Sequence, residues 1–254
     1  MKKKVNYQIL IRVALVLLVM LSLYYFAYRK AELETSGGVV QEGEKEDGEE
    51  GGKEDNKAQE KIRVVIDAGH GGKDPGKVGI NGALEKDINL RIAMKLKEFL
   101  EQADVEVILT RETDAGLYDE DASNKKVQDM KRRVTLIEET APLLTISIHQ
   151  NSYHEEYVHG AQAFYYTGSE KGKELAEIIQ QSLLNEADPE NTRSAKANDS
   201  YYLLKKTSSP IVIVECGFLS NSEEAEKLNS EYYQEKLAWA IHLGVLQYIN
   251  SQSE

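Results

Sequence analysis

The segment that decides the fold starts with IRVVID (residues 62–67), continues with DINLRIAMKLKEFLEQA (87–103) and ends with VEVILT (105–110). Its first and last parts are apolar and rich in β-branched residues, a composition typical of buried strands. The middle part repeats apolar residues every three or four positions, as amphipathic helices do, and we expect Asp87 to cap its start. The segment therefore predicts a strand, a helix and a second strand.

The same alternation continues along the rest of the chain. Further strands are expected at 143–148, 161–166 and 211–215, and further helices at 130–139, 174–184 and 232–249. Strands that alternate with helices predict an α/β fold, in which a mostly parallel central sheet is covered by helices on both faces. We expect residues 61–254 to form this single catalytic domain, with its site at the carboxyl edge of the sheet.

The first sixty residues have a different character. Residues 1–30 begin with a lysine cluster, contain an unbroken apolar run at 13–28 and end in Arg29-Lys30. About 20 apolar residues suffice to cross a bilayer, so we expect an N-terminal transmembrane helix that acts as a signal anchor. A cleaved signal peptide is the alternative, and both place the rest of the chain outside the cytoplasm. The Glu- and Gly-rich residues 31–60 predict a disordered acidic linker.

Charge and cysteine content exclude some classes of protein. The formal net charge of −12 argues against a nucleic-acid partner, because phosphate binding needs clustered lysine and arginine. After residue 30 the densest basic cluster is 131–133, which we expect on a solvated helix face. The single cysteine, Cys216, excludes an internal disulfide, and we expect a small buried side chain there rather than a nucleophile.

Two histidines follow predicted strands. The first strand leads into the glycine-rich residues 68–72, which contain His70, and the strand at 143–148 leads directly into His149. The glycine-rich loop lacks the spacing of phosphate-binding loops, so we expect its glycines to allow a sharp bend that presents His70. Catalytic zinc is held by three His, Asp or Glu side chains and keeps one position for water. The two histidines therefore indicate part of a metal site.

Carboxylates are the second kind of candidate. Glu215 ends the apolar strand at 211–215, and a buried carboxylate is costly unless it has a partner or a function. Glu85 lies just ahead of a predicted helix, where the residues alone favour a surface acid that interacts with the helix dipole. Asp67 either steadies a histidine ligand or caps the turn after its strand.

Four segments together resemble the zinc-dependent N-acetylmuramoyl-L-alanine amidases of bacterial cell-wall turnover (Amidase_3). They are VIDAGHGG (65–72), LEKD (84–87), SIHQN (147–151) and VECGFLSN (214–221). The resemblance covers about residues 62–250, and it implies that His70, Glu85 and His149 bind Zn²⁺ and that Glu215 is the catalytic acid and base. Gln150 stands where many relatives carry a smaller residue.

The resemblance also implies a substrate and a cellular role. Its reaction is hydrolysis of the amide bond between the lactyl group of N-acetylmuramic acid and L-alanine in peptidoglycan. The anchor, the absence of wall-binding repeats and the stretch ENTRSAK (190–196) look most like the germination-specific amidases of spore-formers. These imply a membrane-anchored, extracytoplasmic enzyme of the spore cortex. Its product would pass to a deacetylase that completes muramic-δ-lactam, and an accessory envelope protein is a possible partner.

Two other functions remain open at this point. One is a different envelope zinc peptidase, such as a carboxypeptidase that shortens stem peptides. The other is a catalytically silent peptidoglycan-binding protein that has kept the fold. The complete set of His70, Glu85, His149 and Glu215 weighs against the silent protein.

Overall fold

The structure is a computed structural model that describes residues 61–252, which form a single α/β domain. Its one sheet has six strands in the order β2-β1-β3-β6-β4-β5. The strands are β1 (Arg63–Ala68), β2 (Glu106–Leu109), β3 (Leu144–Asn151), β4 (Gln162–Tyr166), β5 (Lys196–Asn198) and β6 (Ile211–Phe218). All neighbouring strands are parallel except β4 and β6, which are antiparallel. The prediction of a mostly parallel sheet is confirmed.

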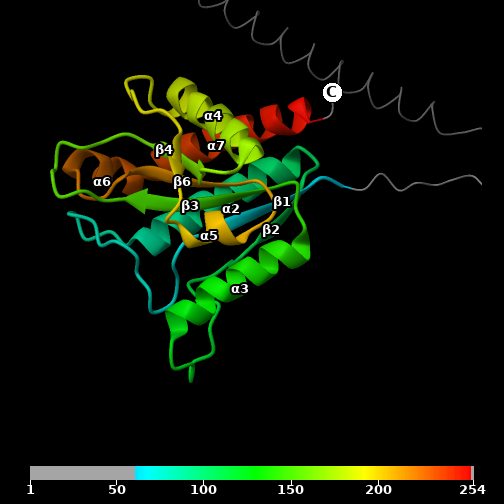
Figure 1. Cartoon of the computed structure of the whole chain (residues 1–254). Helices are drawn as coiled ribbons and strands as arrows, with labels where there is room; N and C mark the ends of the chain where they lie inside the picture. The colour runs from blue at the N-terminus through cyan, green and yellow to red at the C-terminus, as the bar shows by residue number, and fades with distance from the viewer. Residues whose placement is uncertain (1–60, 253–254) are drawn as a thin grey trace, which may run out of the picture. The chain divides into compact units, whose positions relative to one another are not determined.

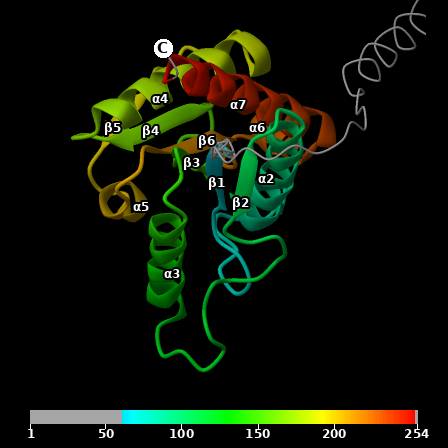
Figure 2. The same cartoon turned by 90° about the vertical axis from the view of Figure 1, so that its right-hand side faces the viewer.

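Helices cover both faces of the sheet, as predicted. They are α2 (Glu85–Gln102), α3 (Lys125–Thr140), α4 (Glu170–Ser182), the π-helical turn η1 (Leu183–Ala187), α5 (Tyr202–Lys206), α6 (Ser222–Asn229) and α7 (Glu231–Ser251). Helices α2, α4, α6 and α7 lie on one face, and α3 and α5 lie on the other (Figure 1 and Figure 2). The central strands are thus enclosed between two helical layers.

The two faces of the sheet belong to two hydrophobic clusters. In β1, Val64 and Ile66 pack into the larger cluster with α2 and α7, whereas Val65 packs into the smaller cluster with α3 and α5. Every residue of β6 is buried. Because both faces are covered, these strands carry apolar residues on both sides, and the resulting apolar runs explain why they could be recognised in the sequence.

The start of α2 differs from the prediction. The helix begins at Glu85, Leu84 is its N-cap residue, and Asp87 lies in the first turn, so the predicted cap at Asp87 is wrong. Backbone carbonyls of the preceding loop replace a side-chain cap: the Glu85 amide donates to Lys77 O at 2.9 Å, and the Lys86 amide donates to Pro75 O at 3.1 Å. The loop before α2 therefore fixes where the helix begins.

The prediction of a solvated basic face at 131–133 is wrong for Arg133. Its side chain, on α3, is only about 1% exposed. The guanidinium lies 2.5 Å from Asp67 Oδ1 and 2.6 Å from Asp129 Oδ2, and these two carboxylates balance the buried charge. Arg133 thereby joins α3 to the end of β1.

The predicted anchor at 1–30 and linker at 31–60 lie outside the described residues. Within residues 61–252, no helix combines the length and the apolar character needed to cross a membrane.

Candidate metal centre

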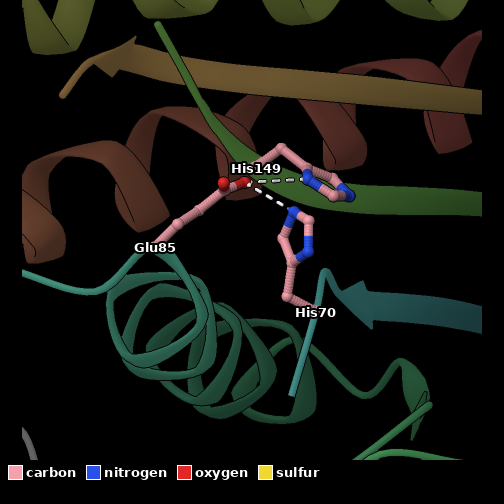
Figure 3. A group of neighbouring side chains, drawn as sticks. All are labelled: His70, Glu85 and His149. Atoms are coloured by element: carbon pink, nitrogen blue, oxygen red, sulfur yellow. Dashed lines mark hydrogen bonds and ion pairs between the residues drawn. The ribbon is translucent and has the colours of Figure 1, made fainter. Parts of the chain in front are cut away.

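Three side chains from three elements meet at the carboxyl edge of the sheet. His70 follows β1, His149 lies near the end of β3, and Glu85 is the first residue of α2 (Figure 3). Glu85 Oε1 lies 3.1 Å from His70 Nε2 and 3.0 Å from His149 Nδ1. One ligand atom from each residue falls within 4.8 Å of the others. The structure thus brings together the three residues that the resemblance implied.

Left-handed backbone presents His70 to this group. Its φ is 63°, a conformation that costs a residue other than glycine about 1–2 kcal/mol. Two contacts hold it there: Asp74 Oδ2 lies 3.0 Å from His70 Nδ1, and Arg133 Nη2 donates to the His70 carbonyl at 2.7 Å. Asp74 can accept the Nδ1 proton of His70, and in that tautomer Nε2 would have its lone pair available for a metal ion in place of its contact with Glu85.

Two glycines make room for the ligand side chains. A Cβ built on Gly69 would lie 2.3 Å from the His149 ring. At Gly76, where φ is 66°, a Cβ would lie 2.6 Å from Glu85 Oε2. Replacing Gly69 or Gly76 by any residue with a side chain would displace a candidate ligand. The two glycines therefore allow the backbone to approach the site closely.

Glu85 is a buried carboxylate that stays ionised. Its side chain is about 4% exposed, and it accepts hydrogen bonds from the backbone amides of Lys77 at 2.7 Å and Gln150 at 3.1 Å. Burial opposes its ionisation, but hydrogen bonds with His149 and His70 outweigh burial and hold its pKa far below the usual range. A negative oxygen is therefore available to a cation.

Glu215 lies beside this group without joining it. It pairs in register with His149 on the neighbouring strand, so both side chains are on one face of the sheet. Its Oε1 accepts a hydrogen bond from the Tyr201 hydroxyl at 3.2 Å, while its buried Oε2 has no partner among the described residues. Burial raises the pKa of Glu215, as does the charge of Glu85. A raised pKa suits a group that accepts and returns a proton near neutral pH.

The donor set fits a catalytic metal. Two imidazoles and one carboxylate are a ligand set with which zinc hydrolases leave a fourth position for water. The unpartnered Oε2 of Glu215 is a second indication, because a buried oxygen without a partner is costly unless it has a function. The four side chains can therefore hold a divalent cation and handle a proton next to it.

A cavity of about 400 Å³ opens at this centre, and we call it the site cavity. Its lining includes His70, His149, Glu215 and Tyr201, and it extends to the first turn of α3. Sequence reasoning missed Tyr201, which precedes α5 and packs its ring edge-on against Phe164. The short helix α5 gave no clear periodic signal that could have placed this tyrosine near the site.

The structure answers two smaller questions from the sequence. Asp67 makes no hydrogen bond or ion pair with a histidine of the described residues and caps no turn, because its carboxylate is engaged by Arg133, Ser147 and Thr110. Both predicted roles for it are wrong, and Asp74 makes the contact with the histidine instead. Cys216 is fully buried in the larger core cluster, and burial raises the pKa of its thiol, which confirms the prediction of a buried hydrophobe.

Comparison with known proteins identifies the family. The family model for N-acetylmuramoyl-L-alanine amidase matches residues 64–247. The chain belongs to this family. Among curated relatives of the amidase family, the germination-specific N-acetylmuramoyl-L-alanine amidase of Bacillus subtilis is 37% identical over 194 residues, which cover 75% of this chain and 81% of the relative.

Solved structures of amidases are also similar to this chain. The CwlD amidase of Clostridioides difficile, solved in complex with the GerS lipoprotein, is 41% identical, with a TM-score of 0.73 and coverage of 75% of this chain and 99% of that one. The amidase AmiC2 of Nostoc punctiforme is 35% identical, with a TM-score of 0.65 and coverage of 74% and 97%. The resemblance read from the four sequence segments is confirmed.

Proposed function

We propose that this protein is a zinc-dependent enzyme that hydrolyses the amide bond between the lactyl group of N-acetylmuramic acid and L-alanine in peptidoglycan. Membership of the amidase family and the names of its relatives support this activity. The observation that carries the proposal is the convergence of His70, Glu85 and His149 next to the unpartnered carboxylate oxygen of Glu215.

In this proposal His70, Glu85 and His149 hold the metal. Bound zinc supplies an acidified water and a positive charge that stabilises a developing oxyanion. Glu215 accepts the proton of the attacking water, for which its free Oε2 is available. It then returns the proton to the leaving amine of L-alanine, so that one carboxyl group acts first as base and then as acid. Tyr201 keeps this carboxyl group in place through its hydrogen bond.

Product analysis tests the reaction. We expect mass spectrometry of peptidoglycan treated with the protein and zinc to show muramic acid with free lactyl ends and peptides that begin with L-alanine. Shortened peptides that are still attached to the sugar would indicate a stem-peptide carboxypeptidase. Binding of muropeptides without cleavage would indicate a silent wall-binding protein. Metal analysis of the same preparation should find zinc at about one ion per chain.

We also propose a role in the spore cortex. The germination-specific name of the Bacillus subtilis relative supports it. The product, a muramic acid without its stem peptide, would be the substrate of a deacetylase that completes muramic-δ-lactam. Spores that lack this protein should contain a cortex without the lactam, and an unchanged lactam content would contradict the role.

The setting of the enzyme is a further part of the proposal. Residues 1–30 would anchor the protein in a membrane, with the catalytic domain on the extracytoplasmic side. A relative was solved together with a lipoprotein, which supports an accessory envelope protein as a partner of this chain. Protease protection and membrane fractionation of the full chain test the anchor, and co-purification from sporulating cells tests the partner.

A further inference from the structure

The site cavity carries a feature that hydrolysis itself does not require. Besides the candidate metal ligands it is lined by three lysines, Lys73 in the loop after β1 and Lys125 and Lys126 in the first turn of α3. The same lining holds Arg133 and four acids, Asp67, Asp74, Asp129 and Glu215, so what matters is which of the lysines lacks an acidic partner. The surface around a cleft steers charged ligands toward it or away from it.

Two of the three lysines are already engaged. Both interact with Glu120: Lys73 Nζ lies 3.1 Å and Lys125 Nζ lies 2.9 Å from its Oε2. Lys125 also lies over the Tyr118 ring, 5.1 Å from its centroid. Each of these ammonium groups therefore has an ion-pair partner, although the two lysines share one carboxylate.

Lys126 is different, because its exposed ammonium group makes no hydrogen bond or ion pair with any residue in the range 61–252. No acid that lines the cavity makes an ion pair with Lys126, although the Lys126 charge is one of the causes that lower the pKa of Asp74. Asp74 is bonded to His70, and Asp67 and Asp129 are bonded to Arg133. The first turn of α3 contains no acidic residue and its N-cap is the neutral Asn124, so no charged side chain there offsets the positive end of the helix dipole. Among the three lysines of the cavity, Lys126 is therefore the one whose ammonium group has no ion-pair partner in the range 61–252.

The chemistry of the substrate indicates what this cation meets. If the lactyl carbonyl lies at the metal centre, the stem peptide leaves from the same point, and its second residue is acidic. One residue of extended chain spans about 3.3–3.6 Å, and a cavity of about 400 Å³ falls in the size range of small-ligand sites. A carboxylate two residues from the scissile bond can therefore lie inside the cavity.

We propose that the Lys126 end of the site cavity binds the free carboxylate of the acidic second residue of the stem peptide. Lys126 is then a binding residue that makes the enzyme prefer peptides with a free carboxylate to peptides in which this group is amidated. This inference rests on the proposed amidase function, and it adds a substrate class to it.

Two muramoyl-peptides that differ only at this group test the inference. One carries D-glutamate with a free α-carboxylate at the second position, and the other carries the carboxamide. We expect wild-type kcat/KM to be roughly two- to fivefold higher for the free acid, the size expected from an ion pair near the surface. The preference should weaken as salt is added, because salt screens exposed charges.

In the Lys126→Gln variant, kcat/KM for the free acid should fall to the value for the carboxamide, and Lys126→Arg should restore part of the preference. Lys131→Gln is the matched control, because Lys131 is exposed on the same helix and does not line the cavity; we expect it to keep the wild-type ratio.

Equal rates of the wild type on both substrates, or an unchanged ratio in Lys126→Gln, would overturn the inference while leaving the amidase function intact. Failure of the wild type to cleave either substrate at the lactyl amide would overturn the proposed function itself, and this inference with it.

Discussion

Glu85 and Glu215 are two buried carboxylates in one site, and their surroundings shift their pKa values in opposite directions. Contacts with two histidines lower the pKa of Glu85 despite its burial, whereas burial and the charge of Glu85 raise that of Glu215. Carboxyl groups whose pKa values are pushed apart in this way commonly divide the chemistry between them. Here the ionised Glu85 is suited to bind a metal ion, and Glu215 is suited to accept and return a proton.

Replacement of Glu215 by glutamine separates these two roles. The amide keeps the size of the side chain but cannot take up a proton, so kcat should fall by roughly 10²–10⁴-fold, the usual contribution of a general base. Bound zinc should be unchanged in metal analysis, because Glu215 is outside the ligand group. Full activity of Glu215→Gln on peptidoglycan would remove Glu215 from the mechanism.

Tyr201 is expected to act on catalysis through Glu215. Its hydrogen bond favours the ionised carboxylate and so lowers the pKa of Glu215. The Tyr201→Phe variant should therefore have a higher Glu215 pKa, and the acidic limb of its pH profile for kcat should move to higher pH. Tyr232→Phe is the control, because Tyr232 is exposed and distant from the cavity lining. An unmoved acidic limb in Tyr201→Phe would exclude this positioning role.

At the scale of elements, the contact between α3 and β1 depends on a buried ion pair. Arg133 is enclosed with Asp67 and Asp129, and it also donates to the backbone carbonyls of Ala68 and His70. Removal of one partner of such a pair leaves a buried charge without compensation. The stability of the domain and the position of the His70 loop are therefore linked through one side chain.

We expect Arg133→Met to lower the free energy of unfolding by about 3–5 kcal/mol, measured by chemical denaturation. Neighbouring Arg132 pairs with Asp119 at the surface, so Arg132→Met should cost less than about 1 kcal/mol. The double variant Asp67→Asn/Arg133→Met should regain part of the loss, because the fully buried carboxylate at position 67 is then absent and only Asp129 is left without its arginine partner. Equal effects of the two arginine variants would show that the buried pair is unimportant.

Asp67 also predicts how stability depends on pH. Burial opposes its ionisation, but Arg133 and Ser147 outweigh burial and lower its pKa from 3.8 to about 2. Because the folded pKa is the lower one, the contribution of ionised Asp67 is complete above about pH 4 and is lost as the pH falls toward 2. The shift corresponds to about 2 kcal/mol. Urea denaturation at several pH values tests this. Between pH 4 and pH 2, the free energy of unfolding of the wild type should fall by about 2 kcal/mol more than that of the Asp67→Asn variant.

The sequence predicted the long strands and helices better than the short ones. Strands β1, β3 and β6 are largely buried and rich in apolar residues, and their ends indicated His70, His149 and Glu215. Strand β5 has three residues and α5 has five, too few for a periodic pattern. The burial of Arg133 and the position of Glu85 depend on segments distant in sequence. Only resemblance to a family placed Glu85 in the site.

For the whole molecule, the candidate ligands connect three separate parts of the fold. His70 follows β1, His149 belongs to β3 and Glu85 begins α2, so a bound ion would join the sheet to the helical layer. A ligand that binds only the native state stabilises it by about 2.7 kcal/mol at a concentration of 100 times Kd. Without an ion, the three side chains still contact each other, so we expect the metal-free protein to remain folded.

Chelation should therefore lower Tm without abolishing the cooperative transition. For a domain of this size, 2.7 kcal/mol corresponds to roughly 5–10 °C. Added zinc should restore the Tm of the wild type, followed by differential scanning calorimetry, but not that of His70→Ala. If EDTA and zinc leave the wild-type Tm unchanged, zinc does not bind to the native state at this site.

Two of the hydrogen bonds that Glu85 accepts come from backbone amides, so they do not depend on which side chains stand at the donor positions. The amides of Lys77 and Gln150 hold its carboxylate, and any residue except proline supplies such a donor. Substitutions at positions 77 and 150 by residues other than proline should therefore leave these two hydrogen bonds in place. The side chains around this candidate ligand can thus change while its backbone hydrogen bonds stay the same.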